Sequence, residues 1–245
     1  MLIRFIIISS SFFWGIVMFF TGNYKEAQKN TPPQVRIQSP KGAGSYPWNT
    51  VIPYAVTVSD KEDGESKYDE IPATDVFLEL RYFTDPGKGT AYAKSTVQKE
   101  PAGYSIIKKQ DCFTCHSVHT KLIGPSFGEI SKKYKKSGDV AAIASRVIKG
   151  SVGLWGPIAM PTHPDLTENN AELVVHWILE NTNNPDVDYF RGAEGSFRIQ
   201  PSPNATSNGI FVLKATYMDR GINDDSTTSL PGEDAITFGV QKIKN

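Results

Sequence analysis

The sequence predicts an α+β multidomain protein, in which an all-α domain is inserted in or flanked by a β-sandwich. Three observations carry this prediction. Apolar residues alternate with polar ones from residue 35 to 83, recur with helical spacing from 103 to 181, and alternate again from 197 to 243. Whole blocks of strands and helices in succession are typical of α+β folds or of separate domains.

The first 22 residues form an apolar run that is broken only by Arg4 and a few polar residues. This pattern predicts a signal peptide. No Ala-x-Ala cleavage site follows, and the run reaches the ~20 residues that a spanning helix needs, so an N-terminal membrane anchor is the alternative. Either form exports the chain. Residues 23–34 are polar and include Pro32-Pro33, which indicates a linker.

The first part of the β-sandwich is expected at residues 35–100. Val35 and Ile37 alternate with polar neighbours, and residues 51–58 form a β-branched and aromatic run. The alternating apolar residues from Val76 to Tyr82 share one strand face. Turn-rich stretches at 39–45 and 59–65 separate these strands.

The helical block is expected at residues 101–184. Ser126 and Glu129 have the spacing of a capping box, which predicts a helix start. Asp139 can cap a second helix that stops at Gly150, and Thr167 can open the last one.

The second part of the β-sandwich is expected at residues 195–245, with strands near 197–199, 209–217 and 235–243. Three strands on each side of the helices enclose little core on their own. One sandwich interrupted by the helical block is therefore physically easier than two separate β-modules, because loops tolerate insertions whose ends lie close together.

Composition excludes little. The chain has 245 residues, of which 39% are hydrophobic and 21% charged, with 26 basic and 26 acidic side chains. This balance gives no support to nucleic-acid binding. The two cysteines lie within one pentapeptide, so they cannot form a disulfide framework.

That pentapeptide, Cys112-Phe113-Thr114-Cys115-His116, is the most informative motif of the chain. Two thiols three positions apart, followed by an imidazole, are what covalent haem attachment requires: the thiols add to the vinyl groups and the histidine faces the iron. A zinc half-site and a redox dithiol are the alternatives. Zinc would need further ligands such as His119, His163 and His176, whose spacing is unfamiliar, and a dithiol expects a βαβ setting.

A sixth iron ligand is available downstream. Met160 lies in the apolar, aperiodic loop Ile158-Ala159-Met160-Pro161, and a thioether is a good soft ligand for iron. His163, three residues further on, is its rival. Met218 lies in the distant β segment and competes poorly.

Residues 104–182 resemble a small bacterial class I cytochrome c. The matching stretches are CFTCHSVHTKLIGPSF, IKGSVGLWGPIAMP and AELVVHWIL, in the order and near the spacing of that family. The resemblance implies thioether bonds at Cys112 and Cys115, His116 as the proximal and Met160 as the distal ligand of haem iron. It also implies that the carbonyl of Pro125 accepts a hydrogen bond from His116.

The same resemblance gives roles to three aromatic residues. Trp155 would line the haem edge near a propionate. Tyr104 and Trp177 would lie where the first and last helices cross, which would bring the ends of the domain together.

The β segments resemble an immunoglobulin-like module of the polycystic-kidney-disease type, through Val56–Asp60 and the stretch FVLKATYMD at 211–219. Asp60, Glu62 and Asp63 could bind calcium, although such a run is more often a solvated turn. Trp48, Tyr54 and Tyr217 could supply an aromatic platform for carbohydrate, although aromatic residues of strands are more often buried.

The sequence therefore predicts an electron carrier and not an enzyme: one haem c with His/Met ligation, at the periplasmic or extracytoplasmic face of the membrane. Expected partners are redox proteins, such as a periplasmic dehydrogenase or a terminal reductase or oxidase. The alternatives are a peroxidase-like haem enzyme, which needs an open sixth position, and a subunit for carbohydrate binding or sensing. A lysine collar could steer an acidic partner; it would comprise Lys108, Lys109, Lys121, Lys132, Lys133, Lys135 and Lys136.

Overall fold

The computed structural model describes residues 29–95, 100–134, 140–206 and 208–241. The predicted signal or anchor segment 1–22 lies outside these residues, as do Lys135, Lys136 and the predicted helix cap Asp139. In the described part of the chain, no helix combines the length and apolar character that crossing a membrane requires.

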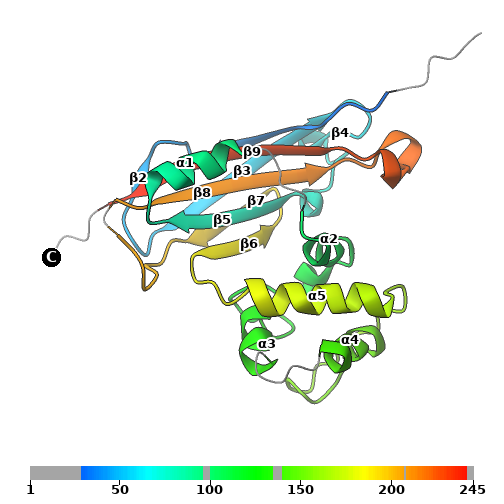
Figure 1. Cartoon of the computed structure of the whole chain (residues 1–245). Helices are drawn as coiled ribbons and strands as arrows, with labels where there is room; N and C mark the ends of the chain where they lie inside the picture. The colour runs from blue at the N-terminus through cyan, green and yellow to red at the C-terminus, as the bar shows by residue number, and fades with distance from the viewer. Residues whose placement is uncertain (1–28, 96–99, 135–139, 207, 242–245) are drawn as a thin grey trace, which may run out of the picture.

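Two β-sheets pack face to face in the upper part of Figure 1. The first contains β1 (Gln34–Ser39), β3 (Val51–Asp60), β4 (Gly64–Glu65) and β7 (Glu194–Arg198), with β3 at its centre. The second has the order β2-β9-β8-β5-β6, comprising β2 (Ser45–Tyr46), β5 (Phe77–Phe83), β6 (Val187–Arg191), β8 (Ile210–Met218) and β9 (Pro231–Val240).

Strands from before and after the helical block pair with each other in both sheets. β5 lies between β6 and β8, and β3 pairs with β7, all antiparallel. The alternation read from the sequence explains the shared core: Ile52, Tyr54, Val56 and Val58 of β3 are buried, and every second residue of β8 faces them. The two β segments therefore build one hydrophobic core.

Residues 29–33 of the predicted linker are docked on this β region. Asn30 is buried, and its Nδ2 donates to Asp219 Oδ2 over 2.9 Å and to the carbonyl of Thr228 over 2.8 Å. The expectation of a free tether up to residue 34 is therefore wrong for its last residues, because a buried amide needs these partners.

Helix α1 (Pro86–Lys94) and strand β6 are among the elements that the sequence analysis did not predict. Helix α1 lies across the second sheet in Figure 1; its two glycines hide its periodicity, but Asp85 caps it by accepting from the amides of Gly87 and Lys88. Strand β6 has only five residues, too few for a clear alternating pattern.

The helical block comprises α2 (Ala102–Lys109), α3 (Phe127–Tyr134), α4 (Val140–Lys149) and α5 (Glu168–Asn181). The capping box is confirmed, since the amide of Ser126 donates to Glu129 Oε2 and the amide of Glu129 donates to Ser126 Oγ. Thr167 caps α5 by accepting from the amide of Asn170. Both helix starts are local features, which is why the sequence predicted them.

The helical block rests on the outer face of the second sheet, beside β6. Tyr104 of α2 stacks on Trp177 of α5 with ring centroids 4.9 Å apart, as the sequence predicted. Tyr189 of β6 lies against both rings, at 5.0 and 5.2 Å, and Phe77 of β5 belongs to the same cluster. The helix crossing and the sheet therefore share one aromatic core.

A half-buried carboxylate at this interface, that of Asp188, predicts a pH-dependent stability. Burial raises the pKa of Asp188 to about 6, and the nearby imidazole of His119 opposes the rise. Because the folded pKa exceeds the unfolded value of about 3.9, the contribution of Asp188 to stability is complete below about pH 4 and is lost as pH rises through 6. Asp188→Asn is expected to abolish this loss and to stabilise the protein at pH 7.5 by roughly 1–3 kcal/mol.

Urea unfolding at pH 4.5 and 7.5 measures this effect, with the exposed Asp165→Asn as control. Equal pH dependence in wild type and Asp188→Asn would contradict the assignment.

Candidate haem site

The pentapeptide forms a tight loop at the end of α2. Asp111 adopts a left-handed conformation at φ +54°, and residues Cys112–Thr114 then make one 3₁₀ turn. The amides of Cys115 and His116 both donate to the carbonyl of Cys112, over 3.2 and 3.0 Å. Both thiols are free, and burial raises the pKa of Cys112 to about 11, so this sulfur carries its proton at neutral pH.

The imidazole of His116 is held from one side. Its Nδ1 donates to the carbonyl of Pro125 over 2.7 Å, and Phe127 stacks on the ring at 5.3 Å with an interplanar angle of 15°. Only 8% of His116 is exposed, and burial lowers its pKa, so the ring is neutral. Since Nδ1 carries the proton, the lone pair of Nε2 is free to bind a metal.

Met160 lies on a loop whose base is hydrogen-bonded to the residue that follows Gly150 at the end of α4. Its amide donates to the carbonyl of Ser151 over 2.8 Å, and the amide of Ser151 donates back over 3.2 Å. Gly150 ends α4 with φ +75°. This pairing fixes the base of the loop Val152–Ala159, which holds Trp155.

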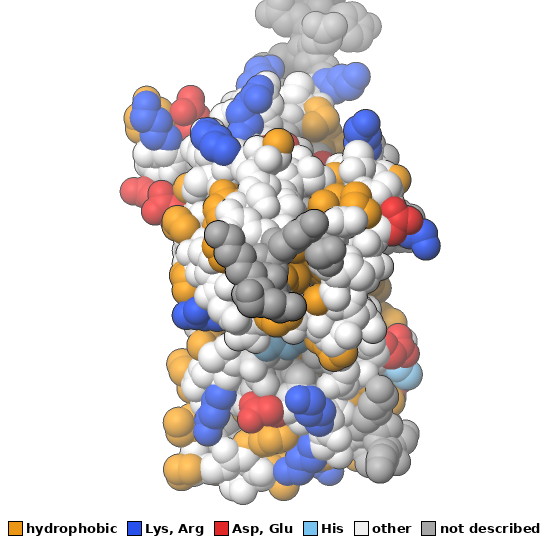
Figure 2. Space-filling view, turned by 90° about the vertical axis from the view of Figure 1, so that its left-hand side faces the viewer, with side chains coloured by type: hydrophobic (Ala, Val, Ile, Leu, Met, Phe, Trp, Pro, Cys, Tyr) orange, Lys and Arg blue, Asp and Glu red, His pale blue; other side chains and the backbone are white. Residues whose placement is uncertain are grey.

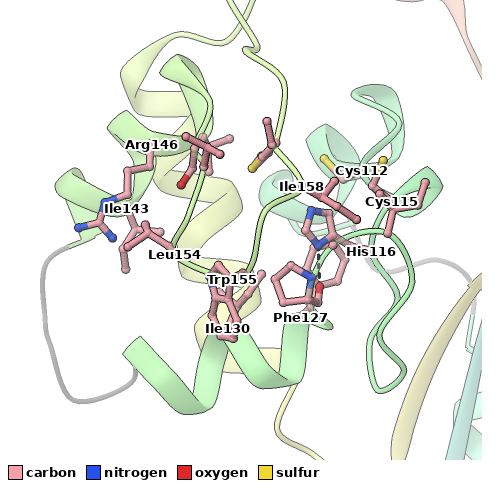
Figure 3. A pocket seen from close by; sticks show the side chains of 18 of the residues that line it. Cys112, Cys115, His116, Phe127, Ile130, Ile143, Arg146, Leu154, Trp155 and Ile158 are labelled. Carbon is pink, nitrogen blue, oxygen red and sulfur yellow. Dashed lines mark hydrogen bonds between the residues drawn. The ribbon is translucent and has the colours of Figure 1, made fainter.

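The attachment loop, α3, α4, α5 and the Met160 loop enclose a cavity of about 220 Å³. Figure 3 shows Cys112, Cys115 and His116 on one side of it, with Ile143 and Arg146 on the opposite side. Most of its lining is aliphatic or aromatic, including Phe127, Ile130, Ile143, Val147, Val174, Val175, Ile178 and Leu179.

The residues present fit a covalently bound haem. Two free thiols and an imidazole with an open Nε2 converge on one apolar cavity, and the thioether residue Met160 lines the same cavity. Zinc lacks support by comparison, because the described residues contain no cluster of three or more Cys, His, Asp and Glu side chains able to hold a metal ion. His163, the rival of Met160, is not among the described residues that line the cavity.

Three further residues at the cavity went unmentioned in the sequence analysis. Arg146 lines it and donates from Nη1 to the hydroxyl of Tyr134 over 3.4 Å. Gly124 lies so close to His116 that an added Cβ would be 2.5 Å from Cε1 of the imidazole. Phe127 stacks on His116. Gly124 and Phe127 both lie in the stretch CFTCHSVHTKLIGPSF, so the resemblance was the signal that could have identified them.

The predicted lysine collar is smaller than expected. Lys121, Lys132 and Lys133 are exposed, and Lys133 lies over Trp155 with Nζ 4.3 Å from the ring centroid. Lys108, in contrast, is only 11% exposed, because it pairs with Glu100 at 2.6 Å and lies over Phe77 in the interface with the β region. Figure 2 shows Lys and Arg side chains among apolar ones on the helical, lower part of one face.

The other candidate sites lie in the β region. Asp60 Oδ1 accepts from the amides of Glu62 and Asp63, and Asp63 Oδ2 accepts from the hydroxyl of Tyr217 over 2.6 Å, so these two oxygens bind the protein's own donors. The buried Asp60 Oδ2 and Glu62 Oε1, in contrast, have no hydrogen-bond partner among the described residues. Tyr54 and Tyr217 are 5% and 2% exposed, which confirms that they are buried strand residues, and the half-buried Trp48 packs edge-on against Tyr82; these three rings form no exposed platform for carbohydrate.

Comparison with known proteins places residues 101–182 in a family. They match the family model described as Cytochrome c. Cytochrome c-552 of Nitrosomonas europaea is 37% identical over 84 residues, which are 32% of this chain and 82% of that protein. Cytochrome c-551 of Pseudomonas aeruginosa is 32% identical over 37% of this chain and 86% of its own, and cytochrome c2 of Rubrivivax gelatinosus is 45% identical over 31% and 92%.

The crystal structure of wild-type Nitrosomonas europaea cytochrome c552 aligns with 31% of this chain and 96% of its own, at 36% identity and a TM-score of 0.30. The family match covers the attachment loop, the Met160 loop and the helices that enclose the cavity. The chain belongs to the class I cytochrome c family, and its cofactor is covalently bound haem c.

Proposed function

We propose that the haem iron is bound by Nε2 of His116 and the thioether of Met160, and that the protein carries single electrons between extracytoplasmic redox proteins. One observation carries this proposal: Met160 lines the cavity into which the two thiols and His116 converge. The haem, when bound, supplies an iron centre that takes up and releases one electron. If His116 and Met160 both bind the iron, it would have no free coordination site for a substrate.

The residues of the chain contribute ligation, orientation and burial. The carbonyl of Pro125 keeps the proton on Nδ1 of His116, and Phe127 restricts the rotation of its ring. The aliphatic lining excludes water, which limits the reorganisation that accompanies a change of charge. Arg146 and Trp155 are the polar side chains we expect near a haem propionate, since both line the cavity.

The proposed partner surface surrounds the Met160 loop. Large apolar side chains lie at the mouth of the cavity, namely Leu122, Ile123, Val152, Leu154 and Ile158, with Lys121 and Lys133 among them; all of these apolar residues except Leu122 also line the cavity, so the partner would contact the parts of them that the haem leaves uncovered. An acidic partner with an apolar centre fits this surface. A periplasmic dehydrogenase or a terminal reductase or oxidase is the class of partner we propose. Residues 1–22 would export the chain or anchor it.

We also propose that residues 101–184 are a cytochrome domain inserted into one immunoglobulin-like sandwich formed by 35–100 and 195–245. The pairing of β3 with β7 and of β5 with β8 supports this division, because β3 and β5 precede the helical block and β7 and β8 follow it.

Met160→Ala tests the ligation. The oxidised wild-type protein is expected to show a weak Met–iron absorption band at the red end of the visible spectrum, and the variant is expected to lose it. Haem staining on a denaturing gel stays unchanged, because both thioether bonds remain. Met218→Ala, an exposed methionine of the β region, is the control.

A band that persists in Met160→Ala and disappears in His163→Ala would assign His163 as the ligand. A high-spin wild-type spectrum with rapid reaction towards hydrogen peroxide would replace the carrier by a haem enzyme.

A further inference from the structure

Strand β6 runs alongside the haem attachment loop and is bonded to it at both ends. At one end Arg191 donates hydrogen bonds to Asp111, which precedes Cys112, and to Thr114, which lies between the two cysteines. At the other end the carbonyl of Val187 accepts from Nε2 of His119 over 3.0 Å. Residues 111–119 are thereby held against residues 187–191, which belong to the β region and not to the helical block.

The guanidinium of Arg191 makes three directed hydrogen bonds. Nη2 donates to Asp111 Oδ1 over 2.6 Å, Nη1 to Thr114 Oγ1 over 2.9 Å, and Nε to the carbonyl of Thr74 over 2.6 Å. Its side chain is only 16% exposed, although Asp111 is 67% exposed. An arginine fork that satisfies three acceptors at once fixes their relative positions, which a lysine ammonium on its flexible stem does much less well.

The space between the two ends is filled by aromatic packing. Phe113, the residue after Cys112, lies 6.0 Å from Phe77 of β5, and the Arg191 guanidinium lies over the same Phe77 ring at 5.8 Å. Phe113 also contacts Phe127, which stacks on His116. A displacement of the loop relative to the sheet would therefore reach the imidazole through two ring contacts.

We infer that Arg191 is a positioning residue for the haem. Through Arg191, strand β6 holds the attachment loop in place, and this contact influences the reduction potential of the haem. Within the loop, the amides of Thr114, Cys115 and His116 donate to the carbonyls of Asp111 and Cys112, so these hydrogen bonds are local and do not connect the loop to the sheet. Pro125 fixes His116 from one side only. The β region supplies the second fixed point, and the potential depends on the orientation and the charges around the ligands.

The test uses the full-length haem-loaded protein with Arg191→Gln and Arg191→Lys. Amide hydrogen exchange at Thr114, Cys115 and His116 is expected to accelerate about tenfold in Arg191→Gln, as expected from the loss of one charge-assisted hydrogen bond. Its midpoint potential is expected to fall, because unpaired Asp111 favours the more positive, oxidised haem. Arg191→Lys keeps the charge and loses the fork, so exchange rises while the potential changes less.

Arg198→Gln is the matched control. Arg198 is the last residue of β7, the next strand along the chain, which belongs to the other sheet. Its Nη1 donates to the carbonyl of Asn49, away from the helical block. Exchange in the attachment loop and the midpoint potential are expected to match the wild type in this variant.

Unchanged exchange and unchanged potential in Arg191→Gln would overturn the inference, even if the melting temperature falls, because a merely structural arginine affects stability alone. Should that variant fold poorly, Thr114→Val removes a single acceptor, and the same two readouts decide. Only the potential readout rests on the proposed ligation. Absence of the Met–iron band from the wild-type spectrum would refute that ligation. The exchange measurement would still show whether Arg191 holds the attachment loop.

Discussion

Gly103→Ala is expected to cost about 3 kcal/mol of stability and to separate the first and last helices of the haem domain. A Cβ at this position would lie 2.2 Å from the carbonyl oxygen of Leu173 and 2.8 Å from Cβ of Trp177. Both atoms belong to the core of α5, so neither can move aside cheaply. The stack of Tyr104 on Trp177 depends on this close approach. Chemical unfolding followed by tryptophan fluorescence measures the loss.

Gly87→Ala is the matched control. Gly87, like Gly103, is the second residue of its helix, but its added Cβ would approach only the capping carboxylate of Asp85, at 3.1 Å. This variant is expected to be neutral or slightly more stable, since alanine is the better helix former. Equal stability of the two variants would show that α2 and α5 can adjust their distance.

Gly124→Ala is expected to disturb the iron site without removing any ligand. The new methyl group would lie 2.5 Å from Cε1 and 2.9 Å from Nδ1 of His116, so the imidazole must turn away from the carbonyl of Pro125. Loss of such an outer-shell contact typically weakens a metal–ligand bond roughly 10–100-fold. Titration with external imidazole measures this weakening, because the variant should bind it at a correspondingly lower concentration.

Gly42→Ala serves as the loop control for this experiment. Its nearest neighbour would be Cβ of Ile236 at an ordinary 3.7 Å, far from the haem domain in the chain. Identical imidazole titrations for Gly124→Ala and the wild type would indicate that Pro125 does not determine the orientation of His116.

The sequence predicted structure best where a feature depends only on residues close together in the chain. The Cys112–His116 spacing, the capping box at Ser126 and Glu129, and the threonine cap of α5 each involve residues a few positions apart. Such features do not depend on distant parts of the chain. Helix α1 was missed because its position depends on a distant strand. Its glycines leave no apolar stripe in the sequence, and Gly89 lies so close to β8 that an added Cβ would be 2.7 Å from Ile210.

Which side chains are exposed depended on the tertiary structure. A lysine in a helix is usually exposed, yet Lys108 is covered by Glu100 and by the aromatic interface. Tyr54 and Tyr217 have the sequence spacing of any strand residue, and only the packing of two sheets buries them. Burial depends on which faces meet, and a single sequence does not record that.

The amino-acid sequence by itself determined the haem chemistry, because thiols, imidazole and their spacing lie within five consecutive residues. Tertiary structure decided what surrounds that chemistry. It brought Met160 to the same cavity as His116 across 44 residues (160 − 116), and it placed β6, a strand from beyond the helical block, against the attachment loop. These contacts join residues up to 80 positions apart, and they form because Phe77, Tyr104, Trp177 and Tyr189 bury their rings together.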